Sequence, residues 1–403
     1  MKWRILLVLG ILLAVLAGTI AVAWRQSPDE SSSWEEEKLS LTPQEHFTVG
    51  FKALNQGDFP KAKASMLALE NIEGFEKHAQ VLRCAFLIKM GDIEAGLSQL
   101  PQMTNDDRLR RKVTLLRAEA FYRLNRLVEA EQLASSVLKE DTGNMEAHRW
   151  LAAIYYDLGA NQAAIYHLNA ITKAQPEDFT PHHLLGQIYF DAENYTSAIN
   201  HLRASLKRNP PDSRRPEIKR YLARSLLKNR QFREIVELVE PSTSDVSLLA
   251  IAGEAYWGLG ETDRAKNFLK QAQKRDAHNR FVLVLQARMA IEAGNPKTAI
   301  EPLKNQLKID PHDVECRYRL ALCYRKLGDL DSYQAEIQKM QTSEELRKQL
   351  SKLTDEAITR PRDADIREKI AKLYQKMGRE KMAAVYRRAA EECRRISIGR
   401  KSE

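Results

Sequence analysis

The spacing of its turn-forming residues most constrains how this chain of 403 residues can fold. Five such residues follow one another at a constant interval of 34 residues: Gly57, Gly91, Asn125, Gly159 and Glu193. Each lies between two short amphipathic segments, as in Ala147–Pro176, and neither segment alone can bury its apolar face. A fixed period of roughly 20 to 50 residues is typical of solenoids, in which each repeat packs on its neighbours. The period therefore predicts a stack of helix–turn–helix pairs.

Small residues recur at fixed distances from these turns. Seven residues before each turn stand Gly50, Cys84, Ala118, Ala152 and Gly186, and five residues after each turn stand Ala62, Gly96, Ala130, Ala164 and Ala198. Side chains this small let the two helices of a pair approach closely. Tyr155 lies three residues after Ala152 and belongs to the same packing register. We expect all of these residues to lie in helix–helix contacts.

The period continues less regularly in the second half of the chain. A turn near Arg230 comes 37 residues after Glu193, and Gly260 follows only 30 residues later. Gly260, Gly294 and Gly328 then restore the interval of 34 residues. The small packing residues of these later repeats are Gly253, Ala265, Ala287, Ala299 and Ala321.

The end of the chain departs from the period once more. The last turn, Gly378, lies 50 residues after Gly328. Ser332–Thr359 contains neither Gly nor Pro, which predicts one long second helix or an inserted helix. Ala371 and Ala383 are the packing residues of a further repeat, the tenth in the chain.

The order of residues within one repeat resembles a known family. In the fourth repeat a small residue, Tyr, Gly, Ala and Pro follow one another as Ala152, Tyr155, Gly159, Ala164 and Pro176. A helix–turn–helix unit of 34 residues with this pattern resembles the tetratricopeptide repeat family, over roughly residues 43–392. The resemblance implies an all-α fold, a right-handed α-solenoid of about ten repeats. It is specific for the fold and says almost nothing about activity, because members bind many different partners.

These patterns predict five segments. They are a signal-anchor or transmembrane helix at 1–25, a flexible polar linker at 26–42, a first block of five repeats at 43–209, a degenerate repeat and joint at 210–241, and a second block at 242–403 with an extra helix near 332–359 and a basic C-terminal end.

The N-terminal segment contains an uncharged apolar run, Ile5–Ala23, which follows Lys2 and Arg4. Its 19 residues would form a helix about 28 Å long, close to the roughly 30 Å of a bilayer's hydrocarbon core. An A-x-A pattern ends at Ala23, so cleavage of a signal peptide near this residue is the alternative. The length of the run favours an uncleaved single-pass anchor. The basic residues before it predict a cytoplasmic N-terminus and an extracytoplasmic, periplasmic repeat region.

The resemblance implies that the first helix of each pair lines a concave groove where ligands bind. Three residues before the turns of the third, fourth, fifth and seventh repeats stand Tyr122, Tyr156, Phe190 and Trp257. Aromatic side chains along a groove offer rigid contact area for a peptide. Packing between helices is the alternative, since aromatic residues at helical spacing are often part of a core.

A basic stripe lies on the first helix of the sixth repeat. Arg220, Arg224 and Lys228 are four residues apart and share one helix face, where they could meet an acidic peptide or another anion. Arg149 and His183 occupy the matching position in the fourth and fifth repeats. The alternative is a solvated surface. Chaperone-binding members of the family grip a carboxylate with Lys, Arg and Asn, and those asparagines are missing here.

No pattern in the sequence indicates catalysis. H-E-x-x-H, C-x-x-C, P-loop and G-x-G-x-x-G motifs are absent, and the neighbours His182 and His183 read as a surface pair without a third ligand. The cysteines are too few and too scattered for a disulfide framework: Cys84, Cys316, Cys323 and Cys393. The net charge of +9 is a mild excess on a mixed surface, which does not indicate nucleic-acid binding. We expect no cofactor and no metal site.

These observations predict a non-catalytic, membrane-tethered scaffold or adaptor that binds a peptide or protein in its groove. Assistance to envelope, secretion or pilus assembly is compatible with this function. The alternative is an oligomerising structural or regulatory subunit of a membrane complex, which associates through 209–241 and 332–359.

Overall fold

The computed structural model describes residues 41–102, 105–158, 160–360 and 363–399. Within these ranges it contains twenty α-helices and no strand, so the prediction of an all-α fold is confirmed. None of the described helices combines the length and the apolar character that crossing a membrane requires. The helix predicted at 1–25 and nearly all of the linker predicted at 26–42 lie outside the described residues.

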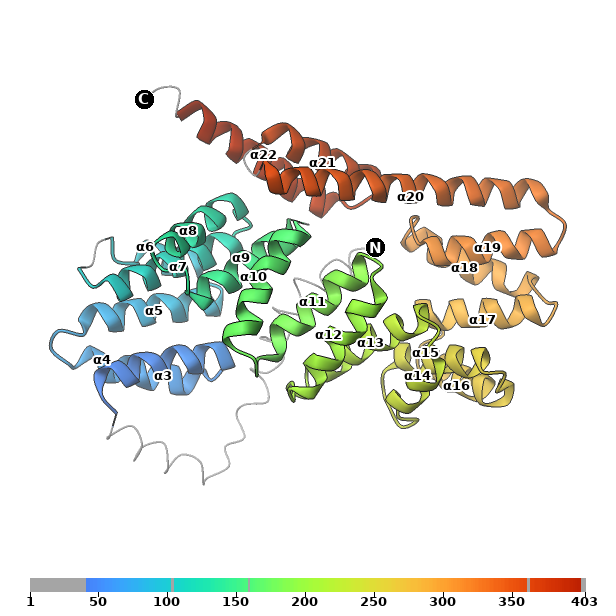
Figure 1. Cartoon of the computed structure of the whole chain (residues 1–403), viewed down its shortest axis with the longest axis horizontal. Coiled ribbons are helices and arrows are strands. Elements are labelled where there is room, and N and C mark those ends of the chain that lie inside the picture. The colour runs from blue at the N-terminus through green and yellow to red at the C-terminus, as the bar shows by residue number, and fades with distance from the viewer. Residues whose placement is uncertain (1–40, 103–104, 159, 361–362, 400–403) are drawn as a thin grey trace. The chain divides into compact units, whose positions relative to one another are not determined.

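The described helices form two compact units, one ending at Ile154 and the other beginning at Tyr155. The boundaries predicted at 43–209, 210–241 and 242–403 describe how regular the repeats are. The division into two units does not test them, so they stay a prediction. The first unit comprises α3 (Pro43–Gln56), α4 (Phe59–Glu70), α5 (Glu76–Met90), α6 (Ile93–Ser98), α7 (Asp107–Arg123), α8 (Leu127–Glu140) and most of α9 (Met145–Asp157) (Figure 1).

The second unit contains the remaining helices. In chain order these are α10 (Asn161–Ala174), α11 (Phe179–Asp191), α12 (Tyr195–Lys207), α13 (Arg215–Lys228), α14 (Phe232–Leu238), α15 (Val246–Gly258), α16 (Thr262–Asp276), α17 (Arg280–Glu292), α18 (Lys297–Ile309), α19 (Val314–Lys326), α20 (Leu330–Thr359), α21 (Ala364–Lys376) and α22 (Glu380–Gly399) (Figure 1).

Left-handed residues stand where the interval of 34 residues predicts the turns. Gly57, with φ 81°, follows α3, and its neighbour Asp58 then accepts a hydrogen bond at its side chain from the Lys61 amide, which caps α4. Where no glycine stands, Asn125 and Glu193 adopt φ of 61° and 58°. The remaining left-handed turn residues at predicted positions are Gly91, Arg230, Gly260, Gly294, Gly328 and Gly378. Gly159 lies outside the described residues.

The small residues assigned to packing lie between the paired helices. The alanines among them are all buried: Ala62, Ala118, Ala130, Ala152, Ala164, Ala198, Ala265, Ala287, Ala299, Ala321, Ala371 and Ala383. Gly50, Gly186 and Gly253 are buried as well. Tyr155 is half-buried and its ring stacks on His167, with centroids 5.6 Å apart. This packing draws the helices of each pair together.

The sixth repeat is shortened but belongs to a continuous core. Its second helix, α14, has 7 residues and ends before Pro241, because a proline disfavours helical conformation in the residue before it. Even so, buried Ile218 on α13 and Ile235 on α14 belong to the same apolar cluster as residues of α12 and α17. The segment 210–241 therefore helps to hold its neighbours together.

The three C-terminal helices return to an early part of the second unit. The uninterrupted stretch predicted near 332–359 forms one helix, α20, whose 30 residues span about 45 Å. It packs against α19, α21 and also α10 (Figure 1). Tyr386 on α22 is fully buried, stacks on Tyr374, and donates its hydroxyl to the carbonyl oxygen of Leu158. The C-terminal helices thus join the start of the second unit to its end.

Candidate functional site

The first helices of the second unit form a continuous layer. From α11 through α13, α15 and α17 to α19, each first helix packs against the next, while α12, α14, α16 and α18 intervene along the chain. Residues at equal distances before the turns occupy equivalent places on these helices and face one side of the layer. We call this arrangement the first-helix layer.

Arg224 on α13 lies among three aromatic rings of this layer. Its guanidinium carbon is 4.3 Å from the ring centroid of Phe190, 5.5 Å from that of Tyr221 and 5.6 Å from that of Phe281. The rings of Phe190 and Tyr221 also meet edge to face, with centroids 5.6 Å apart. A guanidinium near aromatic faces is attracted by their negative π-systems. These four residues are the Arg224 cluster.

The charge of Arg224 is not neutralised by a contact within the protein that the structure describes. No described residue forms an ion pair or a hydrogen bond with its side chain. Burial lowers the pKa of Arg224 below its ordinary value, Arg280 acts in the same direction, and nearby Tyr221 and Asp191 oppose the shift. Arginine nevertheless stays protonated at neutral pH. The cluster therefore holds a partly desolvated positive charge.

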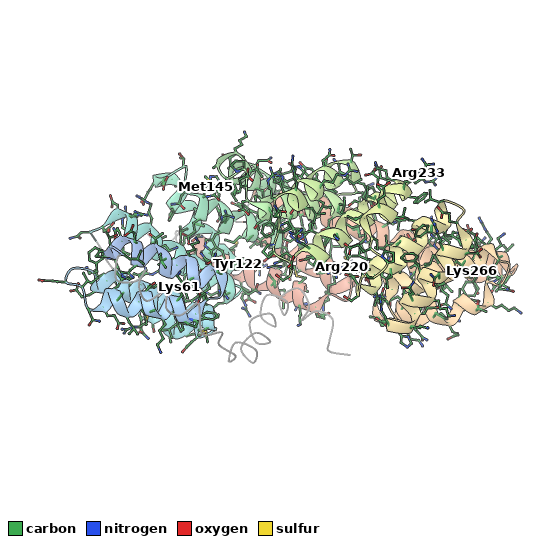
Figure 2. All side chains as sticks on the ribbon, turned by 90° about the horizontal axis from the view of Figure 1, so that it is seen from below. Lys61, Tyr122, Met145, Arg220, Arg233 and Lys266 are labelled. Atoms are coloured by element: carbon green, nitrogen blue, oxygen red, sulfur yellow. The ribbon has the colours of Figure 1, made fainter. Side chains whose placement is uncertain are left out.

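The other two members of the basic stripe have carboxylate partners. Arg220 Nη1 lies 2.7 Å from Oδ2 of Asp245. Lys228 Nζ lies 3.1 Å from Oε2 of Glu315 and so connects α13 with α19. Figure 2 labels Arg220 on its helix, with the exposed Arg233 on the neighbouring α14 for comparison. Within the basic stripe, Arg224 thus differs from Arg220 and Lys228, because no carboxylate among the described residues forms an ion pair with it.

Charges farther along the layer are also matched internally. Arg288 Nη1 lies 3.2 Å from Glu254 Oε1, and Arg319 Nη2 lies 3.9 Å from the same oxygen. Arg280 donates two hydrogen bonds of 2.5 and 2.8 Å to Asp313. Burial raises the pKa of Glu254, and the two neighbouring arginines act against that rise. These pairs hold α15, α17 and α19 together and leave little unbalanced charge.

Two of the predicted groove aromatics lie close to this region. Phe190 belongs to the Arg224 cluster. Tyr156, at the equivalent position of α9, is half-buried. Burial raises the pKa of its phenol, and the negative charge of Asp191 adds to the rise. The packing alternative holds in part for Phe190, because its ring also contacts Tyr195, with centroids 5.8 Å apart.

The other two predicted aromatics have separate surroundings. Trp257 on α15 donates its indole N–H to Glu292 Oε2 at 2.6 Å and packs against Leu285 in a small apolar cluster. Tyr122 belongs to the first unit, where its ring lies 5.5 Å from that of Trp150. The four predicted aromatic residues therefore lie in different surroundings, although all of them stand three residues before a turn.

His183 and Arg149 occupy the remaining predicted positions. The side chain of His183 is buried, so the expectation of a surface pair with His182 is wrong for this residue. Its ring meets Tyr221 edge to face at 6.4 Å, burial lowers its pKa, and its Nε2 has no hydrogen-bond partner in the part of the chain that the structure describes. Arg149 is half-buried on α9, within the first unit.

Tyr221 and Phe281 were missed in the sequence. Tyr221 stands three residues before Arg224 and so shares its helix face. Phe281 stands 13 residues before the turn at Gly294, and Arg224 six residues before the turn at Arg230. These positions differ by seven residues, or two helical turns, and lie on one side of the layer. Extending the register by two turns would have found Phe281.

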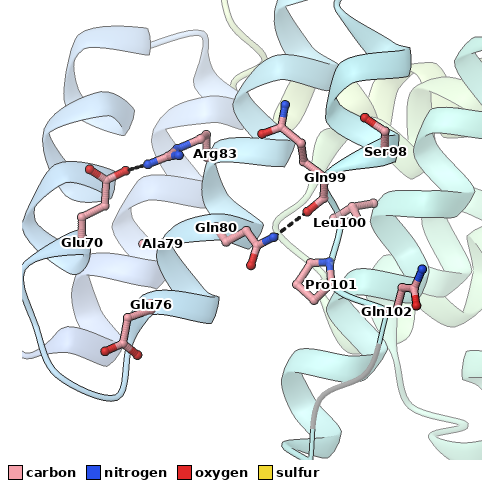
Figure 3. Close-up of a pocket in the computed structure, with 10 residues that line it drawn as sticks. All are labelled: Glu70, Glu76, Ala79, Gln80, Arg83, Ser98, Gln99, Leu100, Pro101 and Gln102. Carbon is pink, nitrogen blue, oxygen red and sulfur yellow. Dashed lines mark hydrogen bonds and ion pairs between the residues drawn. The ribbon is translucent and has the colours of Figure 1, made fainter.

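A cavity in the first unit is a weaker candidate. Its volume is about 660 Å³, and it lies beside the short helix α6 (Figure 3). Two of its polar groups already bind others, since Arg83 pairs with Glu70 and Gln80 donates to the carbonyl oxygen of Gln99 at 2.7 Å. The full lining is Glu70, Glu76, Ala79, Gln80, Arg83, Ser98, Gln99, Leu100, Pro101 and Gln102.

The described residues offer no group of three or more His, Cys, Asp or Glu side chains that could hold a metal ion. The four cysteines are buried, and none of them forms a disulfide within the part of the chain that the structure describes. Burial raises the pKa of the Cys84 and Cys323 thiols to about 11, which keeps them protonated and unreactive at neutral pH.

The chain is similar at low identity to several solved structures. A tetratricopeptide repeat protein from Parabacteroides merdae is 18% identical, with 62% of this chain and 99% of that chain covered and a TM-score of 0.45. The human IFIT1 dimer with PPP-AAAA is 15% identical, with 91% and 95% covered and a TM-score of 0.39. The apo form of RapI is 15% identical, with 89% and 99% covered and a TM-score of 0.41.

Comparison with protein families gives a more direct result. No curated protein matches the chain. Three models described as tetratricopeptide repeat do match it, the first at residues 121–188 and 290–340, the second at 183–234 and the third at 246–279. The matches fall on the helix pairs described above. This chain belongs to the tetratricopeptide repeat family.

Proposed function

We propose that this protein is a non-catalytic scaffold that binds a peptide or protein segment of a partner on the first-helix layer of its second unit. The Arg224 cluster is the observation that carries the proposal. It gathers three aromatic rings around an arginine that has no carboxylate partner among the described residues. Tyrosine, tryptophan and arginine are enriched among the few residues that dominate binding at protein interfaces, and aromatic rings offer large rigid contact areas. In the tetratricopeptide repeat family, the first helix of each pair lines the face where ligands bind.

In this proposal the run Ile5–Ala23 tethers the scaffold to a membrane as a single-pass anchor, with the repeats on the periplasmic side. Cleavage near Ala23 is the alternative. An anchored chain stays in the membrane fraction after an alkaline carbonate wash, and deletion of residues 1–25 releases it. Recovery of the intact chain in the wash would contradict the tether. A role in envelope, secretion or pilus assembly remains compatible with either outcome.

Site-specific photo-crosslinking tests where the partner binds. A photoreactive phenylalanine replaces Tyr195, which is half-buried beside Phe190, or replaces Tyr166, which is 68% exposed on the second helix α10. Irradiation of native membranes is followed by mass spectrometry. We expect a discrete partner adduct from position 195 and none from position 166, because only the first position borders the Arg224 cluster.

The control separates the proposal from nonspecific capture. Equal adducts from both positions indicate binding without preference for the first-helix layer. Adducts from position 166 alone place the partner away from the Arg224 cluster, which contradicts the proposal.

A second candidate function is that of an oligomerising subunit. Two large apolar side chains are exposed at the turn between α19 and α20, Leu327 at 38% and Leu330 at 59%, and Tyr318 near the start of α19 is 42% exposed. Exposed apolar patches often mark protein contacts. Sedimentation of the detergent-solubilised chain tests this function. A complex that dissociates when Leu327 and Leu330 are both replaced by Glu supports self-association, and a monomeric wild type rules it out.

A further inference from the structure

Two positively charged residues at the same register differ in their surroundings. Arg224 stands six residues before the turn at Arg230, and Arg288 six residues before the turn at Gly294. Arg288 is neutralised by Glu254 and also donates from Nε to Glu292 at 3.0 Å. Arg224 has aromatic rings where Arg288 has carboxylates. The fold thus places carboxylates in ion-pair contact with Arg288, whereas among the described residues Asp191 acts on Arg224 only from beyond contact distance.

The geometry of the cluster suits an external counter-ion. Aromatic rings engage the face of a guanidinium, whereas its N–H groups point outward in the plane and can donate two parallel hydrogen bonds to a carboxylate. The side chain of Arg224 is only half-buried, so a ligand can reach it. A partly desolvated cation without a partner is unfavourable, and pairing it with an anion in such surroundings is correspondingly favourable.

The charges nearby limit what kind of anion fits. Asp191 and Arg280 both act electrostatically on Arg224, but Arg280 is already paired with Asp313. Arg220 and Lys228 are also paired. Arg379 also acts electrostatically on Asp191, and beside this carboxylate a singly charged anion is repelled less than a dianionic phosphate. A carboxylate is therefore favoured over a phosphate.

We infer that the Arg224 cluster is a subsite for a peptide carboxylate, with the three rings contacting the apolar part of the same residue and its neighbours. This inference rests on the proposed function and specifies the partner's chemistry. It differs from the clamp of chaperone-binding members, because one arginine on an aromatic support replaces a set of Lys, Arg and Asn. The carboxylate comes from an acidic side chain or from a chain terminus.

Synthetic peptide pools distinguish these sources. Fluorescein-labelled pools carry random apolar and aromatic residues around a central Glu, Gln or phosphoserine, with amidated ends, and a further pool has central Gln and a free C-terminal carboxylate. Fluorescence anisotropy measures binding to the full chain in detergent. We expect the central-Glu pool or the free-terminus pool to bind about tenfold more tightly than the amidated Gln pool, as for one charge-assisted contact.

Two variants of α13 assign the preference to one residue. R224Q should abolish it, whereas R220Q, which alters a cation already paired with Asp245, should retain it. Thermal unfolding by circular dichroism establishes that both variants are folded. A wild type that binds all pools alike, a preference that survives in R224Q, or tightest binding of the phosphoserine pool each overturns the inference.

The proposed function has a separate readout in the same experiment. If F190A no longer binds any pool, but the wild type binds pools with and without a carboxylate equally well, the proposed function stands and the carboxylate subsite alone is overturned. Absence of binding by any pool, together with no adduct at position 195, overturns both.

Discussion

At Gly186 the two helices of the fifth repeat, α11 and α12, lie so close that no side chain fits between them. A Cβ atom there would lie 2.5 Å from Cγ of Leu202. At Gly253 in the seventh repeat a Cβ would lie 2.8 Å from Cδ2 of Leu285 on the next first helix. Real Cβ atoms do not approach other carbons this closely. At these positions glycine is required by space and not by backbone conformation.

Replacing Gly186 by Ala should therefore lower stability by about 1 to 3 kcal/mol, because the added methyl group forces α11 and α12 apart. The matched control is Gly143→Ala, where the nearest atom to an added Cβ is 3.7 Å away in the exposed side chain of Asp141. Urea unfolding of both variants measures the effect. Equal stabilities for the two variants would disprove close packing at Gly186.

A histidine pair makes the fifth repeat sensitive to acid. His182 Nδ1 and His201 Nδ1 are 3.1 Å apart, and Tyr189 stacks on the second ring. Burial, then the positive charge of Arg208, lowers the pKa of His182 to about 4, although Asp178 acts the other way; burial also lowers the pKa of His201. Both rings are therefore neutral in the folded state at neutral pH.

Stability should fall as pH decreases from about 6.5 towards 4, because the unfolded chain takes up protons in this range while the folded chain resists protonation. Above pH 6.5 both states are neutral and the contribution is fully present. Urea unfolding between pH 7.5 and about 4.5 measures the dependence. The double variant His182→Gln, His201→Gln should show a shallower slope, and an unchanged slope would exclude this pair as its source.

The candidate site was only partly predictable because partners far along the chain decide its charges. Phe190 and Arg224 follow from the turn register, and the structure brings them together. The partners of Arg220 and Lys228 lie 25 and 87 residues away, on helices whose contact no local pattern encodes. Sequence reasoning therefore identified a basic stripe but could not show which of its cations lacks a counter-ion.

At the scale of elements, the turn interval located most helix boundaries but not the shortened helices or the C-terminal contact. Left-handed residues occur at the predicted turns because each helix pair needs a sharp reversal after its first helix. The second helices α6 and α14 are short since Pro101 and Pro241 follow them. The return of α22 to Leu158 joins residues 228 apart, and a repeat pattern describes only contacts between neighbours.

The C-terminal contact includes one buried tyrosine hydroxyl, that of Tyr386. Tyr386→Phe should lower the stability of the α21–α22 pair by about 1 to 3 kcal/mol, because the buried carbonyl of Leu158 loses its donor. Hydrogen exchange of α22 amides measures the loss. Tyr374→Phe is the control, since that ring stacks on Tyr386 without providing this hydrogen bond. Equal protection in both variants would show that the hydroxyl does not hold the helices.

At the scale of the whole molecule, the sixth repeat decides whether the second unit unfolds as one body. The apolar cluster that contains Ile218 and Ile235 runs from Ala198 on α12 to Val282 on α17 without a break. In a repeat array, stability is shared between neighbours through such interfaces. A short repeat can therefore still couple the pairs on either side.

Ile235→Ala should destabilise by about 2 to 5 kcal/mol, because it opens a cavity in this shared core. Hydrogen exchange should rise in α12 and α15 as well as in α13 and α14. Glu237→Ala, an exposed position on the same helix, is the control. Loss of protection confined to 210–241 would instead show that this segment is an independent joint.

The affinity of the natural partner for two variants of α13 tests the central claim most directly. The partner recovered by crosslinking at position 195 is purified and titrated against the wild-type chain, R224Q and R220Q. We predict that R224Q binds it at least about tenfold more weakly, because a desolvated, charge-assisted contact is lost, while R220Q stays within about twofold of the wild type. Equal affinities for the three chains would contradict a binding site centred on Arg224.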